Sequence, residues 1–115
     1  MQWKKSPPEL IAAFDKAAPK DSRAVKKPMF GYPALFVNGN MFAGTYQDKV
    51  VVRLAEDDRA RLLKEKGAGP FEPMPGRAMK EYVVVPAALV AKPASLRAWI
   101  ERGLQYALTL PPKKK

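Results

Sequence analysis

Apolar side chains recur about every three to four positions near the start of the chain, which is the spacing of one helix face: Leu10, Phe14 and Ala17. Ser6 and Glu9 form a capping box ahead of this stripe, with proline in the first turn. Pro19 ends the helix because the residue before a proline avoids helical angles. We therefore predict a helix over residues 6–18, followed by a basic loop over residues 19–29.

A β-hairpin is the strongest local prediction. Asn38-Gly39 separates two apolar runs, residues 34–37 and 40–46. Asn and Gly both tolerate the positive φ angles of a type I′ turn, whose twist matches that of the flanking strands. A second turn at residues 47–49 leads into a third strand over residues 50–54, which completes a three-stranded meander.

The remaining residues predict two more helices and two more strands. Residues 56–66 predict a helix, with acidic side chains at its start and a glycine directly after it. A Gly- and Pro-rich loop follows, with one short strand around Phe71. Residues 82–85 form a further strand that a proline ends, and residues 93–108 form a helix with one apolar face.

Strands that are grouped together with few intervening helices predict an α+β fold. The expected order is α-β-β-β-α-β-β-α, with three helices and a mainly antiparallel sheet. A chain of 115 residues has the length of one domain. We expect a single domain over residues 1–115, with flexible ends at residues 1–5 and 111–115.

The predicted strands are apolar on both sides. Pairing across the hairpin turn places Leu35, Val37 and Phe42 on one face of the sheet, and Ala34, Phe36, Met41 and Ala43 on the other. Residues 50–52 and 83–85 are all valine. An antiparallel sheet with one solvated face alternates apolar and polar side chains. Either helices cover both faces, therefore, or a second subunit covers one of them; the second alternative predicts a homodimer.

The composition removes many kinds of chemistry. The chain has no cysteine and no histidine, which excludes disulfides, thiolate and imidazole metal ligands and His-dependent triads. The densest carboxylates are Glu56, Asp57 and Asp58, but adjacent helical residues point apart, so we interpret them as a solvated helix start. The sequence predicts no catalytic residue, no cofactor site and no metal site, and hence a protein that is not an enzyme.

The formal net charge is +10, and the excess lies toward the ends of the chain. One interpretation is a solubilising surface. The other is weak contact with a polyanion such as nucleic acid, which would fall steeply with salt because counterions are released. The candidate residues for such contact are Lys4, Lys5, Lys20, Arg23, Lys26, Lys27, Lys113, Lys114 and Lys115.

No stretch of the sequence predicts insertion into a membrane. No apolar run approaches the roughly 20 residues of a membrane span. The apolar patch of residues 10–14 is too short for the core of a signal peptide. We therefore expect a cytoplasmic protein that does not bind membranes.

Two motifs in order along the chain carry a family resemblance. Residues 27–32 (Lys-Pro-Met-Phe-Gly-Tyr) and 37–43 (Val-Asn-Gly-Asn-Met-Phe-Ala) resemble the N-terminal domain of the TfoX/Sxy family. In that family a Met-Phe-Gly element precedes a hairpin with an Asn-Gly or Asp-Gly turn. Pro70-Phe71, Gly76-Arg77 and residues 79–82 also match, so the similarity covers roughly residues 22–108.

The resemblance implies an α-β-β-β-α-β-β-α two-layer fold like that of secretion chaperones. It also implies a role in regulating natural competence, as a protein-associated transcriptional co-regulator. The named members of the family carry a second, C-terminal domain, and this sequence matches only the first. The family supplies no catalytic residues to transfer.

Four residues are candidates for contact with an unidentified protein partner. Phe30 and Tyr32 are the aromatic side chains of the Met-Phe-Gly-Tyr loop, and a place in the core explains them equally well. Arg77 and Lys80 lie close to Glu81 in the sequence, where they would form either an anion site or a plain surface ion pair.

Overall fold

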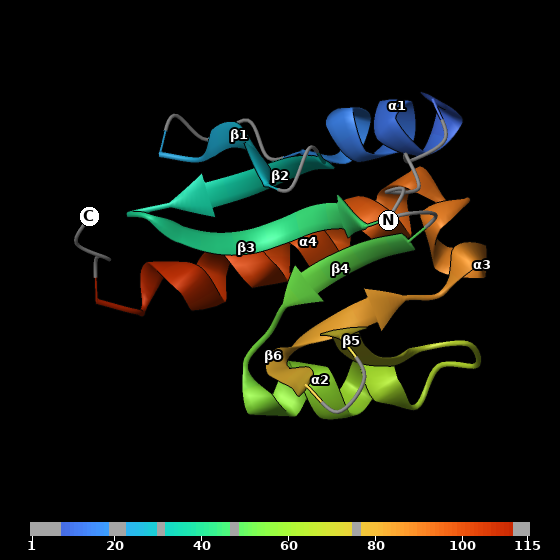
Figure 1. Cartoon of the computed structure of the whole chain (residues 1–115). Helices are drawn as coiled ribbons and strands as arrows, with labels where there is room; N and C mark the ends of the chain where they lie inside the picture. The colour runs from blue at the N-terminus through green and yellow to red at the C-terminus, as the bar shows by residue number, and fades with distance from the viewer. Residues whose placement is uncertain (1–7, 19–22, 30–31, 47–48, 75–76, 112–115) are drawn as a thin grey trace.

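The structure, a computed structural model, describes residues 8–18, 23–29, 32–46, 49–74 and 77–111, with the backbone alone at 29, 70, 72–74, 77–80 and 87 (Figure 1). Its elements are α1 (Pro8–Ala17), β1 (Val25–Met29), β2 (Tyr32–Val37), β3 (Asn40–Tyr46), β4 (Lys49–Arg53), α2 (Glu56–Leu63), β5 (Gly69–Met74), β6 (Arg77–Val85), α3 (Ala87–Val90) and α4 (Pro93–Leu108). Residues 1–5 and 112–115, predicted as flexible ends, lie outside the described residues.

The described strands form one antiparallel sheet in the order β1-β2-β3-β4-β6-β5. Figure 1 shows α4 running behind β3 and β4, and α1 lies beside it on the same side of the sheet. The predicted α+β class and the antiparallel sheet are confirmed. The observed order contains two elements more than the predicted one, β1 and α3.

Strand β1 corrects the prediction of a basic loop over residues 19–29. All five residues of β1 pair with residues 32–36 of β2, and β1 is an edge strand of the sheet. The side chains of Val25, Lys26 and Lys27 are all exposed, which leaves no alternation of buried and exposed positions for a sequence pattern to reveal. Pro28 further masks the strand, since proline in a sheet is confined largely to edges.

Several element boundaries also differ from the prediction. Helix α2 ends at Leu63 instead of residue 66, and the chain then makes turns until Gly67, whose φ is +93°. Strand β6 begins at Arg77, five residues before its predicted start. Helix α3 was not predicted because it is a single turn, closed by hydrogen bonds from the amides of Leu89 and Val90 to the carbonyl of Pro86. Helix α4 has the predicted bounds.

The hairpin has the predicted turn but an unexpected register. Asn38 and Gly39 both have positive φ, 53° and 81°, as a type I′ turn requires. The pairing shifts between Leu35 and Phe36, so that Phe36 faces Met41 while Leu35 faces Ala43.

This β-bulge places one extra residue on β3 and interrupts the alternation of its side chains. Phe42 and Ala43 therefore both join the core under the helices. The prediction that Ala43 lies on the face opposite Phe42 was wrong.

The main core lies between the sheet and the helices. It takes Phe14 from α1, Leu62 from α2 and the predicted apolar face of α4, together with inward-facing residues of the strands. The α4 face consists of Leu96, Ile100, Gly103, Leu104 and Ala107. Gly103 allows α4 to approach the sheet closely, because a Cβ there would lie 2.7 Å from Cγ1 of Val52.

The second face of the sheet carries a smaller cluster of side chains that all come from strands. Val51 is fully buried there, and Phe71 and Tyr82 are nearly so. The ring of Phe71, on edge strand β5, lies 5.2 Å from that of Tyr46 on β3. In a flat sheet these strands would be roughly 14 Å apart, three times the usual strand spacing.

A break in the β5–β6 register accounts for this contact. Pro70 pairs with Val83, whereas Phe71 pairs with Met79, so the hairpin bends sharply between them. This bend places the ring of Phe71 over the second face of the sheet. The side chains that cluster on this face all come from the chain's own strands.

Candidate functional site

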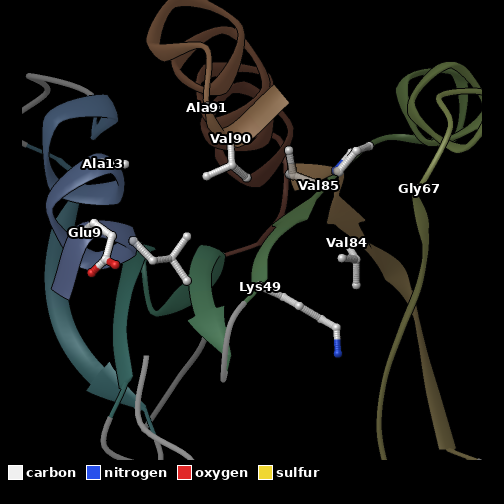
Figure 2. A pocket seen from close by; sticks show the side chains of 10 residues that line it. Glu9, Ala13, Lys49, Gly67, Val84, Val85, Val90 and Ala91 are labelled. Atoms are coloured by element: carbon white, nitrogen blue, oxygen red, sulfur yellow. The ribbon is translucent and has the colours of Figure 1, made fainter. Parts of the chain in front are cut away.

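An open groove of about 570 Å³ lies where β4 begins and β6 ends, between α1 and α3 (Figure 2). Leu10 and Ala13 of α1 form one wall, and Val90 of α3 forms the other. Val84 and Val85 of β6 line it from the sheet. The groove is therefore made by segments far apart in the chain. Leu10, Ala13, Val85 and Val90 belong to the main core or pack against it, whereas Val84 packs against the cluster on the second face of the sheet.

Two charged side chains lie at the rim of this groove. Glu9 comes from α1 and Lys49 from the first position of β4, and both are exposed. Figure 2 shows their charged ends pointing apart. No nucleophile accompanies these two side chains among the residues that line the groove. The groove thus offers apolar surface flanked by one charge of each sign.

A second polar cluster joins β4, β6 and α4. The Nε of Arg53 donates a hydrogen bond of 2.6 Å to Oε1 of Glu81, and the hydroxyl of Tyr106 donates one of 2.6 Å to Oε2. The guanidinium carbon of Arg53 lies 5.7 Å from the ring centre of Tyr82 and 6.0 Å from that of Tyr106. The carboxylate is thus held from two sides and ties the end of α4 to the sheet.

These contacts shift three pKa values. The hydrogen bond from Tyr106, aided by Arg53, lowers the pKa of Glu81 below its ordinary value, although partial burial opposes the shift. The same bond raises the pKa of Tyr106, since its hydroxyl is stabilised in the protonated form. Burial raises the pKa of Tyr82, whose hydroxyl donates a 2.9 Å hydrogen bond to the carbonyl of Met41.

Glu81 therefore pairs with two residues that sequence reasoning did not single out. Arg53 is 28 residues away in the chain and Tyr106 is 25 away, so only the fold brings them together. The one signal in the sequence is that a basic residue directly follows the valine run of β4. The side chains of Arg77 and Lys80, the predicted neighbours of Glu81, lie outside the described residues.

The two candidate aromatic residues have separate outcomes. Tyr32 is only 4% exposed, and its ring centre lies 5.4 Å from that of Tyr46 on the second face of the sheet. Its burial supports the alternative interpretation of a core residue. Phe30 lies outside the described residues.

Of the candidate residues for polyanion contact, the structure describes Arg23, Lys26 and Lys27. All three are exposed, on β1 or just before it. The ammonium of Lys26 lies 2.5 Å from a carboxylate oxygen of Asp15 on α1. Lys4, Lys5, Lys20, Lys113, Lys114 and Lys115 lie outside the described residues.

The acidic residues at the start of α2 do not form a metal site. Glu56 and Asp57 are exposed, and a carboxylate oxygen of Asp58 accepts a 2.8 Å hydrogen bond from Arg102 of α4. Within the described residues, no group of three or more potential ligands could hold a metal ion. None of the described helices is both long enough and apolar enough to cross a membrane.

The fold and the groove together define a small α+β domain with its helices on one side of an antiparallel sheet. The family model described as the TfoX N-terminal domain matches residues 20–107, which begin after α1 and reach into the last turn of α4. The chain belongs to this family, as the motifs in its sequence predicted. A search of curated proteins found no match, and a search of solved structures found none either.

Proposed function

We propose that this chain is a non-enzymatic module that regulates transcription or competence by binding another protein in the cytoplasm. The observation that carries the proposal is the open groove between α1 and α3, whose lining is mainly apolar. Catalysis needs a nucleophile or an acid–base pair held within reach of a reacting atom. The charged ends of Glu9 and Lys49 point apart, which suits orientation of a bound segment better than proton transfer. Membership of the TfoX N-terminal domain family supports the regulatory part.

Deleting the gene in its own organism tests this function. We expect a defined set of transcripts, or the uptake of DNA, to change in the deletion strain and to return when the gene is restored. Transcripts and DNA uptake that stay unchanged in the deletion strain would contradict the proposed role.

Weak nucleic-acid association is a second candidate function. It is favoured by the net charge of +10 and by the run of exposed basic residues at Arg23, Lys26 and Lys27. The ion pair between Lys26 and Asp15 offsets part of that local charge. Steep loss of binding with salt is the signature that identifies this kind of contact.

A homodimer is also part of the proposal, and the oligomeric state of the chain in solution can be measured directly. The apolar second face of the sheet is the surface that supports a dimer, since Met41, Tyr46 and Val84 are only partly buried there beside Val51, Phe71 and Tyr82. Light scattering at micromolar concentration that gives only the 12.8 kDa mass of one chain would exclude it.

A further inference from the structure

We infer that the groove between α1 and α3 binds an acidic segment of a partner protein through two or more of its apolar side chains. This inference rests on the proposed function and names the surface and the chemistry of the partner. The wall that α1 contributes lies outside the residues that match the family, which begin at residue 20. The other lining residues, from Lys49 to Ala91, lie within the matched range, and the match by itself names no binding surface.

The openness of the groove favours a peptide segment over an enclosed small molecule. Of the ten residues that line it, Glu9, Lys49, Gly67 and Ala91 are exposed, and only Val85 and Pro86 are buried. Small-molecule sites bury most of the ligand surface, typically 70–90% or more. A segment of chain lying along the surface needs only to insert side chains.

The lining favours apolar side chains at the points of contact. Leu10, Ala13, Val84 and Val90 are each only partly buried, although three of them already pack against the main core. Inserted apolar side chains would remove this remaining surface from water, at about 25 cal/mol per Å² of apolar area. The volume of about 570 Å³ exceeds what one side chain can fill, so two or more would insert together.

The net charge of the whole chain favours an acidic partner, and the two opposite charges at the rim of the groove set its direction. The chain carries a net charge of +10, which draws acidic proteins toward it over long range. Lys49 at the rim can pair with a carboxylate of the bound segment, next to the apolar side chain of Val84. Glu9 on the opposite wall repels carboxylates. The acidic residues of the segment should therefore lie toward β4 and its uncharged residues toward α1.

The test uses two fluorescein-labelled synthetic peptides of about twelve residues, each with leucines at helical spacing. One carries aspartates beside the leucines, and the other carries lysines at the same positions. We expect the aspartate peptide to bind the intact chain more tightly. In an NMR titration, the amide signals of Leu10, Val84 and Val90 should move on its addition.

Pairs of variants with the same change in charge distinguish binding in the groove from attraction by the net charge of the whole chain. Lys49→Glu should weaken binding of the aspartate peptide about fivefold at low salt, whereas Lys27→Glu, which makes the same charge change on β1, should weaken it less than twofold. Ala13→Glu, in the groove wall, should weaken it about tenfold, and Ala12→Glu, on the exposed side of the same helix, should have little effect. Circular dichroism confirms that each variant is folded.

Two results would overturn the inference. One is equal weakening by Lys49→Glu and Lys27→Glu, which would show that only total charge matters. The other is the absence of binding by the aspartate peptide at about 1 mM, the weak end of specific recognition. Either result would also remove the groove as support for the proposed function, but the regulatory role itself is tested separately. The deletion strain tests that function whatever the peptides do.

Discussion

Gly103 is the residue at which α4 and the sheet come closest together. A Cβ at this position would lie 2.7 Å from Cγ1 of Val52 and 2.9 Å from the carbonyl oxygen of Phe42. The carbonyl belongs to the backbone of β3 and cannot turn aside as a flexible side chain would. Space at this point is therefore a condition for the packing of the main core.

We expect Gly103→Ala to lower the free energy of unfolding by about 1–2 kcal/mol. Overpacking costs about 1–3 kcal/mol, and the better helix propensity of alanine, about 1 kcal/mol, offsets part of it. The measurement is urea unfolding. Gly69→Ala is the matched control, because a Cβ there would meet nothing within 4 Å, and it should change stability by less than about 0.5 kcal/mol. Equal stability of the two variants would contradict this account.

Glu81 should make stability depend on pH on the acid side. Its pKa is lowered in the folded chain, chiefly by the hydrogen bond from Tyr106. It therefore contributes stability above its ordinary pKa of 4.5, and that contribution is lost as the pH falls through the lower folded value. Because the carboxylate is about one-third exposed, we expect Glu81→Gln to lower the free energy of unfolding by only about 1 kcal/mol at pH 7.

Chemical unfolding at about pH 7 and at about pH 3 measures this effect. The difference between wild type and Glu81→Gln should shrink at the lower pH, because the contribution of a carboxylate with a lowered folded pKa declines once the pH falls below its ordinary pKa of 4.5. Glu101→Gln, at an exposed position of α4, controls for the loss of one negative charge. A difference that stays constant between the two pH values would show that the carboxylate charge is not what stabilises the cluster.

Among the elements, α2 shows how one face of a short helix can hold it in place. Leu62 is fully buried in the main core, while its neighbour Leu63 is 44% exposed. We expect Leu62→Ala to lower the free energy of unfolding by about 2–5 kcal/mol through the cavity that it leaves. Leu63→Ala should change it by no more than about 0.5 kcal/mol. Thermal melts of the two variants that coincide would contradict the assignment of this face.

Elements whose signals are local could be predicted from the sequence. The turn at Asn38-Gly39 needs only residues that accept positive φ, and α4 repeats its apolar stripe over 16 residues. Strand β1 was not predicted because its described side chains are all exposed, so its sequence shows no alternation of apolar and polar residues. The β-bulge that turns Ala43 toward the core was not predicted either, because it depends on how β2 and β3 align and no particular residue type marks it.

The candidate site was harder to predict than the fold for the same reason. The groove lies between α1 and α3, and the latter is one turn long. Arg53 and Tyr106 meet Glu81 only after β4, β6 and α4 have packed together. Sequence patterns report the side that an element buries, but they do not report which distant side chains then become neighbours.

At the scale of the whole molecule, the net charge of +10 gives a test of nucleic-acid association. We expect weak binding of fluorescent duplex DNA at about 50 mM salt and its loss near physiological salt, since such binding works by counterion release. The measurement is a fluorescence titration of the full chain at both concentrations. A chain without Lys113, Lys114 and Lys115 shows how much the C-terminal lysines contribute. Binding that persists at physiological salt would favour nucleic acid over the protein partner.

The strand order also predicts the sequence of events by which the chain folds. Among the described strands, each hydrogen-bonded pair joins neighbours along the chain except β4 and β6, between which α2 and β5 intervene. Hairpins close within about 1–10 μs, whereas contacts between distant segments form later because a longer loop must close first. The β1–β4 meander and the β5–β6 hairpin should thus form early, and their union through Val51 and Val84 should limit the folding rate.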